Sequence, residues 1–344
     1  MPSHSNLAVL AAAGSRKTQH IVDGVLSDPT QRVLVTTYTT ENMNQLVERL
    51  SGGTGMLPTH VTVMTWFTFL LNQCARPYQS AVLDEVGVMR GLNFVSARNK
   101  FIRKTNVKRY YLDSNGDMFR DAVAGFAYEA DYCSGGKVIN RLAEIFDHIY
   151  VDEVQDLAGY DLDLLDLLLK SPVAVTIVGD PRQATFATNN GPKNKKYKGS
   201  GIADWLAERK DTCQVDHRAE SYRCNQAICD FADALFPELP RTTSKNTDIT
   251  GHDGVFTITP AEVEAYVEQY EPVVLRWDKR TNTQDLTAMN FGQSKGCTFD
   301  RVLIFPTQPM IKYYRNRDPE QAGDRFKLYV AVTRAKYSVT FVIP

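Results

Sequence analysis

Two short stretches of the sequence combine residue types that bind phosphate and activate water. The first, AAAGSRKTQ at residues 11–19, follows the apolar run LAVL, so a glycine-containing turn would lead from a strand into a helix. In such a turn, backbone N–H groups and the helix N-terminus face a phosphate. A plain strand-to-helix turn is the competing interpretation, because Arg16 stands where a phosphate loop usually has glycine.

We expect the loop to bind ATP despite Arg16. A residue other than glycine in a left-handed backbone conformation costs about 1–2 kcal/mol, which is small beside the full set of phosphate contacts. Lys17 is the expected point charge, and the hydroxyl of Thr18 is an expected Mg²⁺ ligand. The nucleotide contacts predicted in this loop are Ala13, Gly14, Ser15, Arg16, Lys17, Thr18 and Gln19.

The second stretch is HIYVDEVQD at residues 148–156, an apolar run that ends in two carboxylates. The C-terminal ends of strands in an α/β sheet are where the ligand crevice opens. Asp152 is therefore expected to hold Mg²⁺, and Glu153 to accept the proton of the attacking water. A solvated acidic turn before the helical pattern LAGYDLDLLDLLL is the alternative.

The elements that must position these stretches have the pattern of buried parallel strands. Several runs, such as RVLVTTY and VAVTIVGD, are apolar on both faces, which is typical of a parallel sheet covered by helices on both sides. We predict an α/β fold with a first domain over 1–190, interrupted by a helical insertion at about 72–145. A second set of strand and helix patterns predicts another domain over 200–344.

Composition and charge exclude several classes of protein. Apolar residues make up 43% of the 344 residues, and no apolar run approaches the roughly 20 residues that a bilayer requires. The net charge of -1 excludes a uniformly basic protein, so a nucleic-acid site must be a local patch. The six cysteines lack the paired spacing of a zinc site. We expect a cytoplasmic protein that contacts no membrane.

Six further stretches, together with the phosphate loop and DEVQD, resemble the ordered motifs of UvrD/Rep-type superfamily 1 DNA helicases. They run from residue 35 to residue 342 in the order of that family. They are VTTYTTENMNQL (35–46), MTWFTF (64–69), VGDPRQATF (178–186), ESYRCNQAI (220–228), GQSKGCTFDRVLIF (292–305) and KLYVAVTRAKYSVTFV (327–342).

The resemblance implies roles for residues in each motif. The implied catalytic residues are Glu153, Gln183, Arg223 and Arg334, the last as arginine finger, and Gly296 joins the nucleotide contacts. Aromatic side chains in apolar sequence are also typical of a protein core. A core position is therefore the alternative for Trp66, Phe67 and Phe186. The implied nucleic-acid contacts are Thr37, Thr65, Trp66, Phe67, Phe186, Ser294 and Lys295.

The resemblance further implies two RecA-like P-loop domains with ATP and Mg²⁺ in the cleft between them. The chain departs from the family by leaving no room for an adenine-reading glutamine motif and by lacking most of the accessory domains. We therefore expect a compact ATP-driven translocase or helicase on single-stranded DNA. Two alternatives are an RNA-directed helicase and a nucleotide-gated nucleic-acid-binding or signalling module without processive unwinding, with a nuclease as a possible partner protein.

Overall fold

The computed structural model describes residues 6–84, 88–95, 98–99 and 101–344. These residues form two compact units. Unit 1 comprises the described residues of 1–10, 18–181 and 186–216, and unit 2 comprises 11–17, 182–185 and 217–344. The phosphate loop and the segment after GDP are therefore grouped with unit 2 by their packing.

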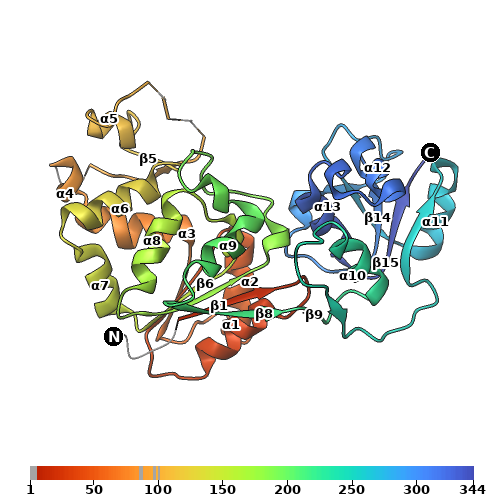
Figure 1. Ribbon diagram of the computed structural model, residues 1–344, viewed down its shortest axis with the longest axis horizontal. Helices are drawn as coiled ribbons and strands as arrows, with labels where there is room; N and C mark the ends of the chain where they lie inside the picture. The colour runs from red at the N-terminus through yellow and green to blue at the C-terminus, as the bar shows by residue number, and fades with distance from the viewer. Residues whose placement is uncertain (1–5, 85–87, 96–97, 100) are drawn as a thin grey trace. The chain divides into compact units, whose positions relative to one another are not determined.

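Unit 1 is built on a six-stranded sheet in the order β3-β2-β6-β7-β1-β8. The pairs β1–β7, β7–β6, β6–β2 and β2–β3 are all parallel, as the two-sided apolar runs predict (Figure 1). The strands are β1 (Asn6–Ala11), β2 (Val33–Thr37), β3 (Val61–Thr65), β6 (His148–Val151), β7 (Ala174–Gly179) and β8 (Cys213–Arg218).

Helices lie on both faces of this sheet. One face packs on α1 (Lys17–Leu26), where Gly24 allows close approach of the Tyr150 ring, because an added Cβ would lie 2.6 Å from the Tyr150 hydroxyl. The alternate residues of the same strands, such as Ile149 and Ile177, face a core to which helical residues of 162–169 and 202–206 contribute. The other α-helices of unit 1 outside the β3–β6 connection are α2 (Thr40–Leu50), α8 (Tyr160–Leu169) and α9 (Ile202–Ala207).

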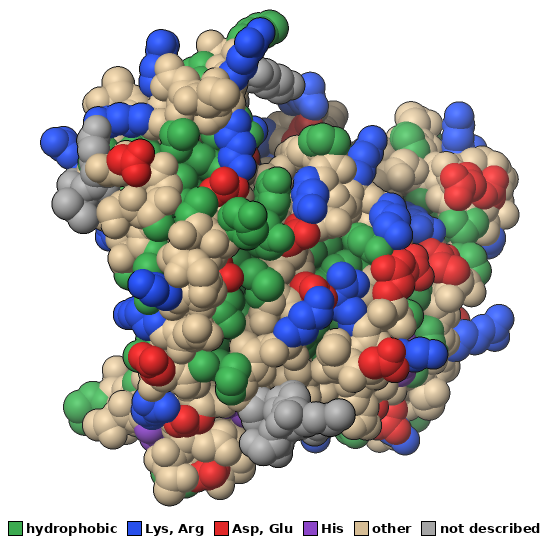
Figure 2. All heavy atoms as spheres, turned by 60° about the vertical axis from the view of Figure 1, so that its left-hand side comes forward, with side chains coloured by type: hydrophobic (Ala, Val, Ile, Leu, Met, Phe, Trp, Pro, Cys, Tyr) green, Lys and Arg blue, Asp and Glu red, His purple; other side chains and the backbone are tan. Residues whose placement is uncertain are grey.

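The connection from β3 to β6 is mainly helical. A π-helical turn at Leu70–Ala75 packs against α6, and a two-residue pair, β4 (Leu92–Asn93) with β5 (Met118–Phe119), closes a loop. Lys and Arg side chains gather over the part of unit 1 that carries α5 (Figure 2). The helices are α3 (Trp66–Phe69), α4 (Ser80–Leu83), α5 (Val107–Tyr111), α6 (Val123–Cys133) and α7 (Lys137–Ile145).

Unit 2 contains a second parallel sheet in the order β11-β15-β14-β12-β13. Residues alternate between its two faces: Leu303 and Phe305 pack with α11, whereas Val302 and Ile304 pack with α10, α12 and α13. The strands are β11 (Gly254–Ile258), β12 (Val273–Arg276), β13 (Ala288–Asn290), β14 (Phe299–Phe305) and β15 (Ala335–Val342). The helices are α10 (Gln226–Asp233), α11 (Val263–Tyr270), α12 (Gln308–Asn316) and α13 (Arg325–Val332).

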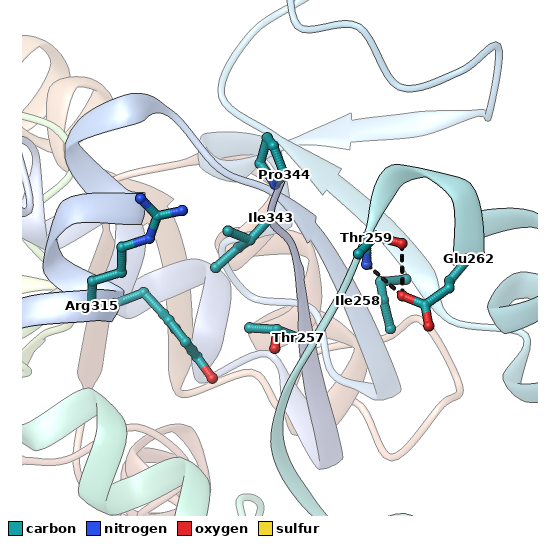
Figure 3. Close-up of a pocket in the computed structure, with 8 residues that line it drawn as sticks. Thr257, Ile258, Thr259, Glu262, Arg315, Ile343 and Pro344 are labelled. Atoms are coloured by element: carbon teal, nitrogen blue, oxygen red, sulfur yellow. Dashed lines mark hydrogen bonds between the residues drawn. The ribbon is translucent and has the colours of Figure 1, made fainter.

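The predicted fold class is confirmed, since two parallel sheets are each flanked by helices. A hollow of about 280 Å³ in unit 2 opens beside the capping box of Thr259 and Glu262, and none of the predicted site residues lines it (Figure 3). In the part of the chain that the structure describes, every helix is too short or too polar to cross a bilayer.

Candidate active site

The phosphate loop leaves β1 at Ala11 and enters α1 at Lys17. The Lys17 ammonium turns back over the loop and donates to the carbonyl oxygens of Ala11, at 3.1 Å, and Ala12, at 2.9 Å. Gln19, on the first turn of α1, donates to Asp23 at 2.7 Å. The Lys17 ammonium therefore points across the loop. A bound phosphate could replace its carbonyl partners, because the net free energy of such hydrogen bonds is small.

Gly14 is required by its conformation and by its neighbours. Its φ is 78°, and an added Cβ would lie 2.6 Å from Ser221 Oγ and 2.7 Å from Arg223 Cβ. The Tyr222 N–H donates to the Gly14 carbonyl at 2.9 Å, so the loop packs directly on the segment that carries Arg223. Among the described residues, the buried hydroxyl of Ser15 has no hydrogen-bond partner.

Arg16 adopts the left-handed conformation expected of the missing glycine, with φ 63°. Its guanidinium lies over the ring of Tyr222, 3.9 Å from the centroid. A cation–π contact at an exposed site contributes about 0.5–1 kcal/mol, which offsets part of the backbone cost. Sequence reasoning did not identify Tyr222, although it directly precedes Arg223 in ESYRCN.

Asp152 and Glu153 stand at the C-terminal end of β6, as predicted. Asp152 is buried and accepts a hydrogen bond from the Glu153 N–H at 2.9 Å. Glu153 has φ 58°, a strained conformation for a residue other than glycine, and one of its carboxylate oxygens accepts from Asn42 Nδ2 at 3.2 Å. Non-glycine residues held in such conformations cluster at functional sites.

Gln155 links this turn to the end of β7. Its amide nitrogen donates to the Glu153 carboxylate, and its amide oxygen accepts from the Asp180 N–H at 3.1 Å. Gly179 makes room for the amide, because an added Cβ would lie 2.5 Å from Gln155 Oε1. Gln155, which contacts Glu153, was not identified from the sequence. Its position two residues after Glu153 in DEVQD could have pointed to it.

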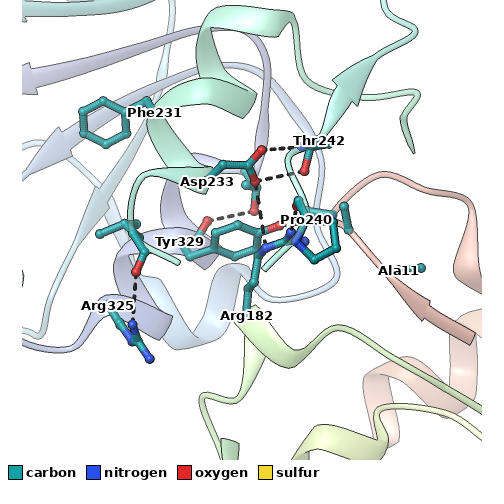
Figure 4. A network of polar contacts seen from close by, with 12 residues as sticks. Ala11, Arg182, Phe231, Asp233, Pro240, Thr242, Arg325 and Tyr329 are labelled. Carbon is teal, nitrogen blue, oxygen red and sulfur yellow. Dashed lines mark hydrogen bonds and ion pairs between the residues drawn. The ribbon is translucent and has the colours of Figure 1, made fainter. Parts of the chain in front are cut away.

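Arg182 anchors the GDPRQ segment within unit 2 (Figure 4). The buried Asp233 carboxylate lies 3.9 Å from Arg182 Nε, and Arg182 Nη2 donates to the Pro240 carbonyl. The guanidinium centre lies 5.8 Å from the ring centroid of Tyr329, whose hydroxyl accepts from the Ala13 N–H at 3.2 Å. The network thus connects the phosphate-loop backbone to the segment that precedes Gln183.

Gln183 and Arg334, both predicted to be catalytic, lie in contact. Arg334 is buried, and its Nη2 donates to Gln183 Oε1 at 3.1 Å, while its other nitrogens donate to the carbonyls of Val330 and Cys297. Lys295 Nζ donates to the Gln183 carbonyl at 3.2 Å. Lys295, predicted to contact nucleic acid, therefore lies beside the pair that is predicted to be catalytic.

The other predicted residues of unit 2 have different surroundings. Arg223 Nη1 donates to the Thr333 carbonyl at 3.1 Å, one residue before Arg334. Gly296 has φ 90°, a conformation that favours glycine. Ser294 is predicted to contact nucleic acid, but it is buried and its hydroxyl donates to the Phe291 carbonyl at 2.8 Å, which closes a helical turn.

The predicted nucleic-acid contacts of unit 1 separate into core and surface. Trp66 is 1% exposed and its indole donates to Asp161 at 2.6 Å, so it lies in the core, which is the alternative considered for the aromatic residues. Thr65 caps α3 through a bond from the Thr68 N–H. Thr37 is buried, and its hydroxyl has no hydrogen-bond partner within the described part of the chain.

Phe186 is the predicted aromatic residue that reaches the surface. It is 40% exposed and stacks on Tyr38, with ring centroids 5.7 Å apart. Phe67 is 5% exposed and packs against Tyr38 at 5.9 Å, so it supports the surface rings instead of forming a stacking surface itself. Tyr38 lies one residue beyond the predicted Thr37 and was not identified from the sequence.

The donor set fits Mg²⁺ held together with a nucleotide. Across the residues that the structure describes, no cluster of three His, Cys, Asp or Glu side chains could hold a metal by itself. Mg²⁺ is typically bound by one or two protein ligands plus phosphate oxygens and water, which Asp152 and Thr18 of unit 1 would match. The unpartnered Ser15 hydroxyl fits a phosphate oxygen in the same way.

Two solved structures are similar to the chain in fold. The chain matches solved structures of the Arterivirus nonstructural protein 10 helicase, with a TM-score of 0.49 and 16% identity over 98% of this chain. For the complex of that helicase with DNA, the TM-score is 0.50 and the identity 15%. The chain spans 60% and 61% of the length of these two proteins, so the likeness concerns the fold alone. No curated protein matches the chain.

A family model provides the assignment that structural likeness alone does not. The model described as the viral superfamily 1 RNA helicase core domain matches residues 139–343, which is more than half of the chain. This match begins ahead of DEVQD and includes Gln183, Arg223 and Arg334. The predicted superfamily 1 membership is confirmed, and the chain belongs to the viral superfamily 1 RNA helicase core family, whose members are nucleoside-triphosphate-hydrolysing helicases.

Proposed function

We propose that the chain hydrolyses ATP with Mg²⁺ and uses the reaction to move along single-stranded nucleic acid. The observation that carries the proposal is the Gln183–Arg334 contact, which joins a residue positioned to sense the terminal phosphate with a guanidinium that would stabilise its charge. An arginine in this role contributes about 10³–10⁵ in rate. A module that only binds nucleotide needs no such pair.

The proposal assigns the phosphates to the loop at Ala13–Thr18, with Lys17 as the main charge. Asp152 and Thr18 would hold Mg²⁺, which neutralises charge on the phosphate oxygens when it is bound. Glu153, held by Asn42 and Gln155, would take the proton of the attacking water. Arg223 and Arg334 would bind phosphate oxygens.

We propose RNA as the preferred strand in place of single-stranded DNA. The matched family is described as an RNA helicase family, and the matched Arterivirus helicase has been solved in complex with DNA. The family description favours RNA, while contacts to the backbone and base stacking tolerate either sugar and would still allow DNA to bind. The UvrD/Rep-type resemblance stays a prediction, and it would favour DNA.

An ATPase assay tests this proposal with no nucleic acid, single-stranded RNA, single-stranded DNA and duplex as four arms. We expect stimulation by both single strands, at lower concentrations of RNA, and a steep loss of strand affinity between about 50 and 200 mM salt. Lys17→Ala should abolish hydrolysis, whereas Lys210→Ala, at an exposed lysine of unit 1, should leave it unchanged. Binding of nucleotide and strand without any hydrolysis would instead support a nucleotide-gated module.

A further inference from the structure

Four aromatic rings of unit 1 form a continuous row. In order they are Phe94, Phe67, Tyr38 and Phe186, and neighbouring ring centroids are 5.5, 5.9 and 5.7 Å apart. Phe94 comes from the helical connection between β3 and β6, outside every motif found in the sequence. The row therefore extends the surface of Tyr38 and Phe186 onto a segment with no assigned role.

The rings differ in exposure. Phe67 is 5% exposed and makes an edge-to-face contact with Phe94. Phe94 is 56% exposed and Phe186 is 40% exposed. Exposed apolar side chains that adjoin one another mark an interaction site, unlike singly scattered ones. Both ends of the row thus present aromatic surface to solvent.

The charge around Phe94 favours a polyanion. The segment that follows it carries Arg98, Arg103, Lys104, Lys108 and Arg109 within 15 residues, and all but Arg98 are exposed. Exposed hydrophobic and basic side chains share the corresponding face of unit 1 (Figure 2). Some of them also approach carboxylates: Lys104 pairs with Glu129 at 2.5 Å, and Arg98 lies 3.9 Å from Asp121.

We propose that Phe94 stacks on a base of the bound single strand and extends the Tyr38–Phe186 surface beyond the motif residues. Every base has a π-face, so single strands are bound by aromatic side chains flanked by basic residues without regard to sequence. The inference deepens the proposed function and rests on it. It commits to single-stranded nucleic acid as the occupant, because aromatic rings flanked by cationic side chains match the bases and the phosphates of a single strand.

The test is fluorescence anisotropy of the full chain with labelled oligouridine and with an abasic RNA of the same length. Phe94→Ala should weaken binding of oligouridine about tenfold, within the range that a lost base–aromatic stack produces, and should barely change binding of the abasic strand. Phe94→Trp should retain affinity. Phe94→Leu keeps an apolar contact with Phe67 but has no aromatic face, so it should bind as weakly as Phe94→Ala even if the alanine variant is less stable.

Phe101→Ala is the matched control, because Phe101 is 93% exposed in the same connection and lies outside the row. It should bind oligouridine like the unmodified chain. The inference is wrong if Phe94→Leu binds within twofold of the unmodified chain, or if Phe101→Ala shows an equal loss. If the unmodified chain binds neither RNA nor DNA, the proposed function itself fails.

Discussion

The phosphate loop and the turn after β6 both follow a buried parallel strand, yet they hold their functional groups differently. Lys17 donates hydrogen bonds to carbonyls of its own loop, and the Arg16 guanidinium makes a cation–π contact with the Tyr222 ring. Glu153 is held from two sides by Asn42 and Gln155. The loop groups can change partners at little cost when phosphate arrives, whereas the carboxylate is oriented in advance, as a general base requires.

The largest effect that would test this contrast is expected at Glu153. Glu153→Gln keeps the size of the side chain but removes the proton acceptor, so kcat should fall at least about 10²-fold with nucleotide binding retained. Steady-state hydrolysis and calorimetric binding of ATP measure the two effects separately. Glu48→Gln, at an exposed glutamate of α2, is the control. Hydrolysis within a few-fold of the unmodified chain would remove Glu153 from the mechanism.

A smaller effect is expected at Gln155. Gln155→Leu removes both hydrogen bonds of the side-chain amide while keeping a similar volume, so Glu153 loses a support and kcat should fall about tenfold. KM for ATP should change little, because Gln155 has no assigned contact with nucleotide. Gln269→Leu, at an exposed glutamine of α11, should change neither constant. A rise in KM with kcat unchanged would show that Gln155 acts on binding instead of on the base.

The loop should tolerate changes that the carboxylate turn does not. Arg16→Gly relieves the left-handed backbone cost and loses the contact with Tyr222, so KM for ATP should change by less than about tenfold, or 1.4 kcal/mol. Arg16→Ala loses the contact but keeps the backbone cost, and it should be less stable than Arg16→Gly in thermal unfolding. If the unmodified chain binds no ATP but the Arg16→Gly variant does, the natural loop is inactive.

A separate effect, on stability and its pH dependence, concerns the core in which Asp161 contacts Trp66. Burial raises the pKa of Asp161 to about 6, although hydrogen bonds from Thr188 and Trp66 oppose the shift. Because the folded pKa exceeds the unfolded value of about 3.9, this contribution to stability is complete below about pH 4 and is lost as pH rises through about 6. The loss should be of the order of 3 kcal/mol in the free energy of unfolding.

Denaturant unfolding at about pH 4 and about pH 7, followed by tryptophan fluorescence, measures that difference. Asp161→Asn cannot titrate, so the part of the pH dependence that Asp161 contributes should disappear. The exposed Asp211→Asn should retain it. An unchanged pH dependence in Asp161→Asn would assign the effect to other groups.

Local sequence was sufficient to predict the strands and the residues at their ends. Apolar runs such as HIYV and VAVTIV can only be buried on both faces, which requires a helix-covered parallel sheet. Polar residues that directly follow such runs must then emerge at one edge, so the positions of Lys17, Asp152 and Glu153 followed from short-range pattern alone.

Tertiary structure alone decided which aromatic and polar side chains are buried and which are paired. Trp66 and Phe186 were both predicted to contact nucleic acid, yet Trp66 contacts Asp161, 95 residues away, in the core, whereas Phe186 reaches the surface. The Gln183–Arg334 contact spans 151 residues. Burial and pairing depend on which residues pack against a side chain. These residues are distant in sequence, so the local pattern does not identify them.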